Sequence, residues 1–168
     1  QGGTSIMVLG GVTPLHKTVP DAPHLSTVIK RELIMMFGVP EEAIEEVDLD
    51  PFAGTYMQLS HLALRIREAS QISEIHELAI LSNFWQLSRI CSMVYHRAEL
   101  ADVLLQDRPR VRYVAAEDVI ADGESWRYGE IVAAYRRAEM RSLIQKQLRG
   151  AWMIAEGTYV FPTTFPNR

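Results

Sequence analysis

Short apolar runs alternate along the chain with longer stretches in which apolar residues recur at helical spacing. The short runs predict strands at 5–10, 77–82 and 112–116, and a further strand is expected at 44–49, where apolar and acidic residues are mixed. The longer stretches predict helices at about 26–37, 55–70, from 83 onward and at about 126–148. Strands that alternate with helices indicate βαβ units. The expected fold is therefore a single α/β domain over 1–168, a three-layer, Rossmann-like sandwich with a mainly parallel sheet.

Individual residues predict where these elements begin and end. Ser26 or Thr27 is expected to cap the first helix, and Gly38 to end it. Thr55 is expected to cap the second helix. The inner side of the last helix is expected to carry Ile131, Val132, Tyr135, Ala138, Ser142, Leu143 and Leu148. Residues 1–4 are interpreted as a disordered or processing remnant, and 158–168 as an extended tail.

Composition and charge narrow the classes of function. Apolar types make up 48% of the chain and its formal net charge is −4, which argues against a general nucleic-acid binder. No apolar run is long enough to span a membrane, and a cytoplasmic protein is expected. The single cysteine, Cys91, excludes an internal disulfide and is expected to be a buried, inert thiol. The five histidines lack metal-ligand spacing, so no metal site is expected.

One segment carries a positive net charge, although the chain as a whole is acidic. Residues 126–149 hold six basic and two acidic side chains, a net charge of +4. A basic face of this kind can dock a phosphate-rich ligand or the acidic patch of a second subunit, or it can simply be a solvated face.

In a parallel sheet, ligands bind outside the carboxyl ends of the strands. The positions that follow the four predicted strands are therefore the candidates: Gly10 and Gly11, then 48–55, 82–89 and 117–124. A dinucleotide-binding glycine fingerprint and a P-loop are both absent from the sequence, so the class of ligand is not set by these motifs.

The segment 82–89 carries the most chemistry. Ser82 ends a strand, and a helix begins after Asn83, so free backbone N–H groups and the positive end of the helix dipole predict an anion site. Gln86 lies in the first turn, and Arg89 is near enough to turn back toward that anion. In the alternative interpretation, Ser82 or Asn83 only caps the helix and Arg89 pairs with a surface carboxylate.

Three further groups are candidates. Thr55 and Gln58 either form a capping box or orient a ligand. Gly10 and Gly11 allow close approach of a ligand to the backbone, or are a plain strand exit. The acidic residues after the second strand either bind a cation or a ribose hydroxyl or are solvated; they are Asp48 and Asp50.

The order of these motifs resembles the YdcF/SanA/ElyC family of bacterial α/β domains. The resemblance covers about 6–94 and rests on Leu9-Gly10-Gly11, Gly38-Val39-Pro40 with Ile44, Asp48, Thr55-Tyr56-Met57-Gln58, and Ser82-Asn83-Phe84-Trp85-Gln86-Leu87-Ser88-Arg89. It departs from the family pattern at Leu9, where the family has serine, at Met57-Gln58, where it has Glu-Asn, and at Gln86, where it has histidine. The family's earlier strand and helix have no counterpart before the first predicted strand. Either that N-terminal βα unit is removed or lies on another chain, or the first strand here is the family's first and an insert is deleted. A sheet edge exposed by its absence would favour pairing with another chain.

The resemblance implies a pocket for a small anionic or nucleotide-like ligand, S-adenosylmethionine in some members. The first expected function is therefore binding of a phosphorylated or nucleotide-type molecule at the carboxyl edge of the sheet, with hydrolysis or transfer at the phosphate if there is turnover. Glutamine does not titrate, so Gln86 cannot replace a catalytic histidine, and whether the chain is an enzyme stays open. The alternative is a non-catalytic homologue that acts in assembly, as a homo-oligomer or with a missing N-terminal segment.

Overall fold

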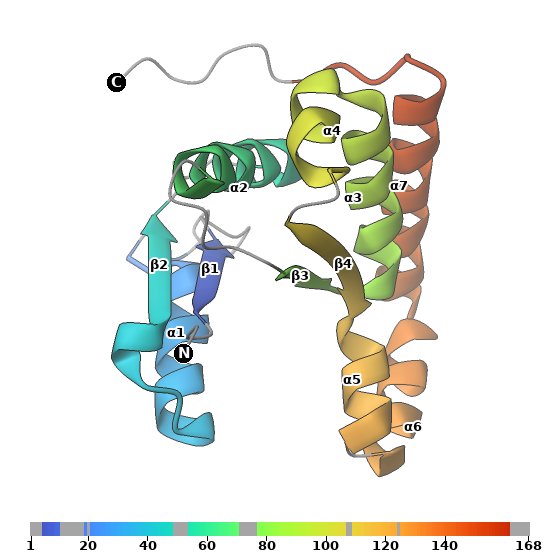
Figure 1. Cartoon of the computed structure of the whole chain (residues 1–168). Helices are drawn as coiled ribbons and strands as arrows, with labels where there is room; N and C mark the ends of the chain where they lie inside the picture. The colour runs from blue at the N-terminus through green and yellow to red at the C-terminus, as the bar shows by residue number, and fades with distance from the viewer. Residues whose placement is uncertain are drawn as a thin grey trace. The chain divides into compact units, whose positions relative to one another are not determined.

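The computed structural model describes residues 5–10, 19, 21–48, 54–70, 77–106, 109–123 and 125–161. These residues form a mixed α/β structure with two parallel pairs of strands (Figure 1). The chain divides into two compact units, which comprise 1–61 and 62–168. The division falls within α2 (Thr55–Ser70). Each unit is described by itself.

The first unit is built on one βαβ connection. Strand β1 (Ile6–Gly10) pairs in parallel with β2 (Ile44–Asp48), in a register that runs from Ile6 opposite Ile44 to Gly10 opposite Asp48. Between them lie α1 (Leu25–Phe37) and the short 3-10 helix η2 (Glu41–Ala43). Buried apolar side chains of both strands contribute to the core of this unit: Val8, Ile44 and Val47. The two predicted strands and their parallel order are confirmed.

Helix α1 ends where the sequence predicts and begins slightly earlier. Gly38 adopts φ 64°, and the backbone N–H groups of Gly38 and Val39 donate to the last carbonyls of the helix, as in a Schellman motif. The cap position at the start belongs to His24, which makes no side-chain cap hydrogen bond. The prediction of Ser26 or Thr27 as the cap was wrong, because both lie inside the first turn: Ser26 is fully buried, and the Thr27 hydroxyl donates to Glu46 instead.

Helix α2 also starts within one residue of its prediction. Thr55 is its first residue, and the N–H of Gln58 donates to the carbonyl of Gly54 at 3.2 Å, which places Gly54 at the cap position. The prediction that Thr55 caps this helix was therefore wrong by one residue. Its buried side chains recur at helical spacing, at Leu59, Leu62, Ala63 and Ile66.

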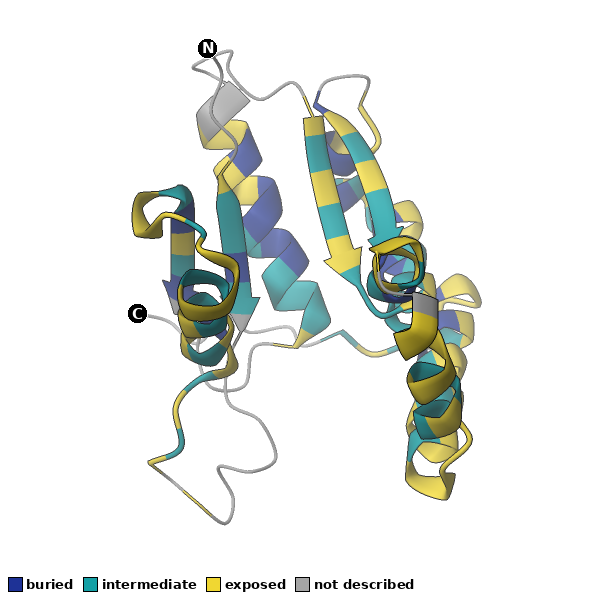
Figure 2. Cartoon of the chain, turned by 90° about the horizontal axis from the view of Figure 1, so that it is seen from below, coloured by how far each residue is buried: buried dark blue, intermediate teal, exposed yellow. Residues whose placement is uncertain are grey.

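The second unit contains the other parallel pair. Strand β3 (Glu77–Ser82) pairs with β4 (Arg110–Ala115), and Ser82 lies opposite Ala115 at their carboxyl ends. Exposed and partly buried residues alternate along β3, as Figure 2 shows. Strand β4 starts two residues before the predicted Arg112. Apart from the exact ends of β4, the predictions of both strands are confirmed.

Five helices complete this unit: α3 (Phe84–His96), α4 (Ala98–Leu104), α5 (Ala116–Gly123), α6 (Ser125–Tyr135) and α7 (Ala138–Ala155). Helices α3 and α7 pack side by side, and the Ser92 hydroxyl donates to the carbonyl of Ala151 at 3.0 Å (Figure 1). The most deeply buried side chains come from α3 and α4, and they are Met93, Val94, Leu100 and Leu104.

The prediction of one helix over 126–148 was wrong. The helix breaks at Arg136 and Arg137, and α7 continues to Ala155. The break shifts the phase of the second half, so that predicted inner residues of α7 are exposed; they are Ala138, Ser142, Leu143 and Leu148. The buried residues of α7 are instead Gly150, Ala151 and Ile154. Helices α4 and α5 were not predicted at all.

The coarse fold class is thus confirmed as mixed α/β with parallel strand pairs. No helix in the described part of the chain is both long enough and apolar enough to cross a membrane. After α7, residues 158–161 have no regular secondary structure, and the rest of the predicted tail lies outside the described residues, as do residues 1–4.

Candidate functional site

The start of α3 is the centre of the predicted site. Asn83 occupies the cap position, and its carbonyl accepts the N–H groups of Gln86 and Leu87 at 2.9 and 3.0 Å. Asn83 is one of the two residues to which the alternative interpretation gave the cap position, although its side chain makes no cap hydrogen bond. The free N–H of the first helical residue, Phe84, is instead bound by a carboxylate of the chain itself.

That carboxylate belongs to Glu117, which the sequence flagged only as one position after the fourth strand. Glu117 is the second residue of α5, directly beyond the carboxyl end of β4, and is only 6% exposed. One of its oxygens accepts the Phe84 N–H at 2.9 Å, and the other accepts the Tyr135 hydroxyl of α6. An internal anion therefore already lies at the positive end of the α3 dipole.

Tyr135 and its neighbours enclose this carboxylate. The pKa of the Tyr135 hydroxyl is raised to about 12, mainly by burial and in addition by the hydrogen bond to Glu117. The indole N–H of the buried Trp85 lies near the same hydroxyl and acts in the opposite direction on its pKa. The Phe84 ring packs against Tyr135 with a centroid separation of 5.7 Å. The result is a cluster of Phe84, Trp85, Glu117 and Tyr135 at the carboxyl edge of β3 and β4.

Arg89 is bound to α7 and to the segment that follows it. Its guanidinium donates to Gln147 Oε1 at 2.9 Å and to the hydroxyl of Tyr159, and it lies 5.2 Å from the centre of the Tyr159 ring. Gly150 lies beside this guanidinium, and a Cβ at this position would lie 3.5 Å from Arg89 Nε, which is an ordinary contact. In the structure, Arg89 therefore connects α3 with the C-terminal part of the unit through an amide and a phenol.

The ten predicted site residues fall on both units. In the second unit, Ser82 ends β3, and Asn83 and Gln86 lie at the start of α3, close to Glu117 through the bond at Phe84. In the first unit, Gly10 and Asp48 are register partners at the ends of their strands, while Thr55 and Gln58 lie in the first turn of α2. Gly11 and Asp50 lie outside the described residues.

Glu117 and Tyr135 are the residues that sequence reasoning missed. The position of Glu117 after a strand was a usable signal, because ligands and caps gather at carboxyl ends of parallel strands. Nothing in the sequence links it to Tyr135, which lies 18 residues further along on another helix.

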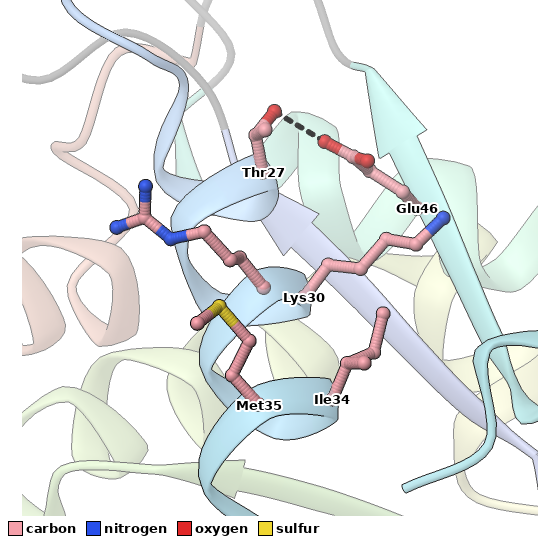
Figure 3. A pocket seen from close by; sticks show the side chains of 6 residues that line it. Thr27, Lys30, Ile34, Met35 and Glu46 are labelled. Atoms are coloured by element: carbon pink, nitrogen blue, oxygen red, sulfur yellow. Dashed lines mark hydrogen bonds between the residues drawn. The ribbon is translucent and has the colours of Figure 1, made fainter.

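A separate open hollow of about 270 Å³ lies on the first unit, over α1 and β2. Figure 3 shows the Thr27 hydroxyl pointing to Glu46, at 2.5 Å from its Oε1, with the side chains of Lys30, Ile34 and Met35 along the helix. The Lys30 ammonium pairs with Glu41 at 3.2 Å. The ammonium group of Lys30 at this hollow is therefore already neutralised by a carboxylate of the chain. Among the residues that the structure describes, no cluster of three side chains is suited to hold a metal ion.

Comparison of the chain with protein-family models, with curated proteins and with solved structures gave no match. The functional argument therefore depends on the geometry of the cluster around Glu117.

Proposed function

We propose that this chain binds a nucleoside-type small molecule at the carboxyl edge of β3 and β4, with Glu117 as the residue that recognises it. The observation that carries the proposal is the buried carboxylate of Glu117, held between the Phe84 N–H and the Tyr135 hydroxyl. A carboxyl edge of parallel strands is the usual place for a ligand in an α/β structure.

The chemistry of the cluster favours a ligand that donates hydrogen bonds over one that brings a phosphate to α3. Each carboxylate oxygen has one recorded protein donor here, and each can accept a second hydrogen bond. Ribose hydroxyls and the ammonium group of an S-adenosylmethionine-like molecule are donors of this kind. A phosphate placed at the same helix end would meet the negative charge of Glu117, and like charges at short range oppose binding.

The neighbouring side chains support binding more than catalysis. Ser82, Asn83 and Gln86 offer neutral groups that hydrogen-bond without changing charge. Glu117 and Tyr135 bond to each other, and the raised pKa of Tyr135 keeps its hydroxyl protonated near neutral pH. The proposed activity is therefore recognition of the ligand, with no step assigned beyond it.

We also propose three properties that the sequence leads us to expect. They are membership of the YdcF/SanA/ElyC-like family, a Rossmann-like three-layer sandwich and a cytoplasmic location. The order of motifs over 6–94 supports the first, and the two parallel βαβ-type strand pairs support the second. The third is consistent with a chain whose described helices are not suited to span a membrane.

The test is calorimetric titration of adenosine, S-adenosylmethionine, adenosine monophosphate and inorganic phosphate into the full chain, with melting temperatures measured alongside. Adenosine or S-adenosylmethionine is expected to bind and to stabilise the chain, by about 2.7 kcal/mol at one hundred times its Kd. Inorganic phosphate is expected not to bind. If neither adenosine nor S-adenosylmethionine binds, or if inorganic phosphate binds as well as they do, the proposal is wrong.

The matched variants are Glu117→Gln and Tyr135→Phe. Glu117→Gln keeps the size of the side chain and one oxygen acceptor but removes the charge, so affinity for a donor ligand is expected to fall at least about tenfold. Tyr135→Phe keeps the carboxylate and is expected to lose less affinity. Titrations are made below the melting temperature of each variant. Unchanged affinity in Glu117→Gln would exclude Glu117 as the recognition residue.

A further inference from the structure

Two helices of the chain present exposed faces whose chemistry differs from one to the other. One face is apolar and belongs to α1, in the first unit. The other is basic with large apolar side chains and belongs to α7, in the second unit. Neither face takes part in the cluster around Glu117.

The outer face of α1 is unusually apolar for an exposed helix. Met35, Met36 and Phe37 at its end are each more than 70% exposed. Leu25, Ile29, Glu32 and Met36 follow one another at the i, i+4, i+7, i+11 spacing that forms a single stripe along a helix. Glu32 is the one charged member, and its exposed contact with Arg31, at 3.6 Å, is worth little.

The outer face of α7 has the same spacing with a different chemistry. Arg141, Gln145, Leu148 and Trp152 form a stripe that is exposed along its length, and Trp152 is 65% exposed. The buried residues of α7 lie away from this stripe, with Gly150 and Ile154 on the opposite side of the helix. In the described part of the chain, Arg141 has no ion-pair partner.

We propose that α1 of one copy of this chain packs antiparallel against α7 of a second copy. In this direction Leu25 meets Trp152 and Ile29 meets Leu148, so that large apolar side chains bury one another. Glu32 then lies beside Gln145 and one turn from Arg141, which places opposite charges together. If the helices packed in parallel, Glu32 would lie against Leu148. Both the apolar pairs and the proximity of Glu32 to Arg141 would then be lost.

Charge complementarity between the two units supports a second copy as the occupant. The first unit, 1–61, holds three basic and eight acidic residues, a net charge of −5; seven of the eight acidic residues lie outside α1, and Glu41 and Glu42 follow closely after its end. The segment that contains α6 and α7 holds six exposed basic residues and two acidic ones, a net charge of +4. Each copy carries both surfaces, so the contact is heterologous and either closes into a ring or continues from copy to copy.

Cysteine cross-linking tests the contact directly. In a Cys91→Ala background, a chain with Ile29→Cys is mixed with a second chain with Leu148→Cys and oxidised. A disulfide between the two chains is expected to form rapidly. Ser142→Cys, which is also exposed on α7 but on a different side of the helix, is the control and is expected to cross-link to Ile29→Cys much more slowly. Equal rates, or a chain with both cysteines that forms only an internal disulfide, would overturn the proposal.

A charge exchange tests the same contact without new bonds. Sedimentation at low salt is expected to show association of the wild-type chain that Arg141→Glu weakens at least about tenfold, since it brings two like charges together. Adding Glu32→Arg to this variant is expected to restore association. Lys146→Glu, an exposed change of the same kind outside the stripe, is expected to have little effect. A chain that stays monomeric up to about 1 mM, or a double variant without rescue, would contradict the proposal.

Discussion

The hydroxyl of Tyr113 on β4 is buried and has no hydrogen-bond partner among the described residues. The pKa of this hydroxyl is raised to about 12, mainly by burial and in addition by the nearby Cys91 and Tyr95. Leaving a buried hydroxyl without a partner costs free energy that the aromatic ring alone would not lose. This hydroxyl is therefore a local weakness of the second unit.

Tyr113→Phe is expected to leave the free energy of unfolding unchanged or to raise it by up to about 1 kcal/mol, because it removes an unpartnered polar atom and keeps the ring. Urea denaturation measures the change. Tyr95→Phe is the control, since Tyr95 is largely exposed. If Tyr113→Phe instead lost more than about 1 kcal/mol, its hydroxyl would have a hydrogen-bond partner in solution.

At the scale of single residues, the sequence predicts that an anion lies at the start of α3, but it does not predict which group supplies that anion. It placed an anion at the start of α3, and a carboxylate does lie there, but it is that of Glu117 and comes from the chain itself. Local spacing reports on residues within a few turns, whereas the bonds to Phe84 and Tyr135 join three different helices. The contacts of Arg89 with Gln147 and Tyr159 are missed for the same reason.

At the scale of elements, Gly150 shows how α3 and α7 fit together. It is a buried glycine inside α7, and a Cβ at this position would meet Arg89 Nε at 3.5 Å, an ordinary contact. Gly150→Ala is therefore expected to stabilise the chain by about 0.5–1 kcal/mol, because alanine loses less conformational freedom in a helix interior. Thermal and urea unfolding measure the gain.

Gly129→Ala in α6 provides the matched control. An added Cβ at Gly129 has open space around it, so this variant reports helix propensity without any new contact. Similar gains in both variants are expected. A Gly150→Ala variant that is less stable than wild type, beside a stabilised Gly129→Ala, would mean that Arg89 cannot shift and that its bonds to Gln147 and Tyr159 fix the helix spacing.

The elements that sequence predicted well have strong local signals. The end of α1 at Gly38 depends on a left-handed residue, and three of the four strands follow short, mainly apolar runs, whereas β2 has three acidic residues among its five. Helix α4 has no comparable cap, since Arg97 makes no side-chain cap hydrogen bond, yet Leu100 and Leu104 are almost completely buried. The break between α6 and α7 occurs at two arginines, which carry no helix-stop signal.

At the scale of the whole molecule, sequence patterning gave the class and the parallel strand direction but not the grouping of strands. Parallel pairing follows from strands separated by helices, because a crossover is needed to return the chain. Which strands pair depends on contacts between distant segments: β1 pairs with β2 and β3 with β4, each pair within its own unit. The basic charge of 126–149 is visible in the sequence alone, whereas the acidic charge of the first unit becomes clear only once that division is known.

Alkaline pH is expected to weaken the second unit through Tyr113 and Tyr135. Both have a pKa raised to about 12 in the folded chain, whereas tyrosine in an unfolded chain titrates near 10. Between these values the folded chain keeps protons that the unfolded chain has lost, so the free energy of unfolding falls as pH rises. The contribution is complete below about pH 10 and is lost as pH passes 12.

Urea unfolding from pH 8 to about pH 12 isolates the contribution of Tyr135. The wild type is compared with Tyr135→Phe and Tyr128→Phe, because each variant shares all other titrating groups with the wild type. Tyr135→Phe is expected to be less stable at pH 8 by about 1 kcal/mol, because Glu117 loses a donor. That difference is expected to shrink as pH rises above 10, because only wild type has the raised Tyr135 pKa to lose. Tyr128→Phe, an exposed change on the same helix, is expected to follow the wild-type curve. A difference between wild type and Tyr135→Phe that stays constant across the range would show that Tyr135 is not held by Glu117, and the cluster at the start of α3 would then lack the hydrogen bond on which its geometry depends.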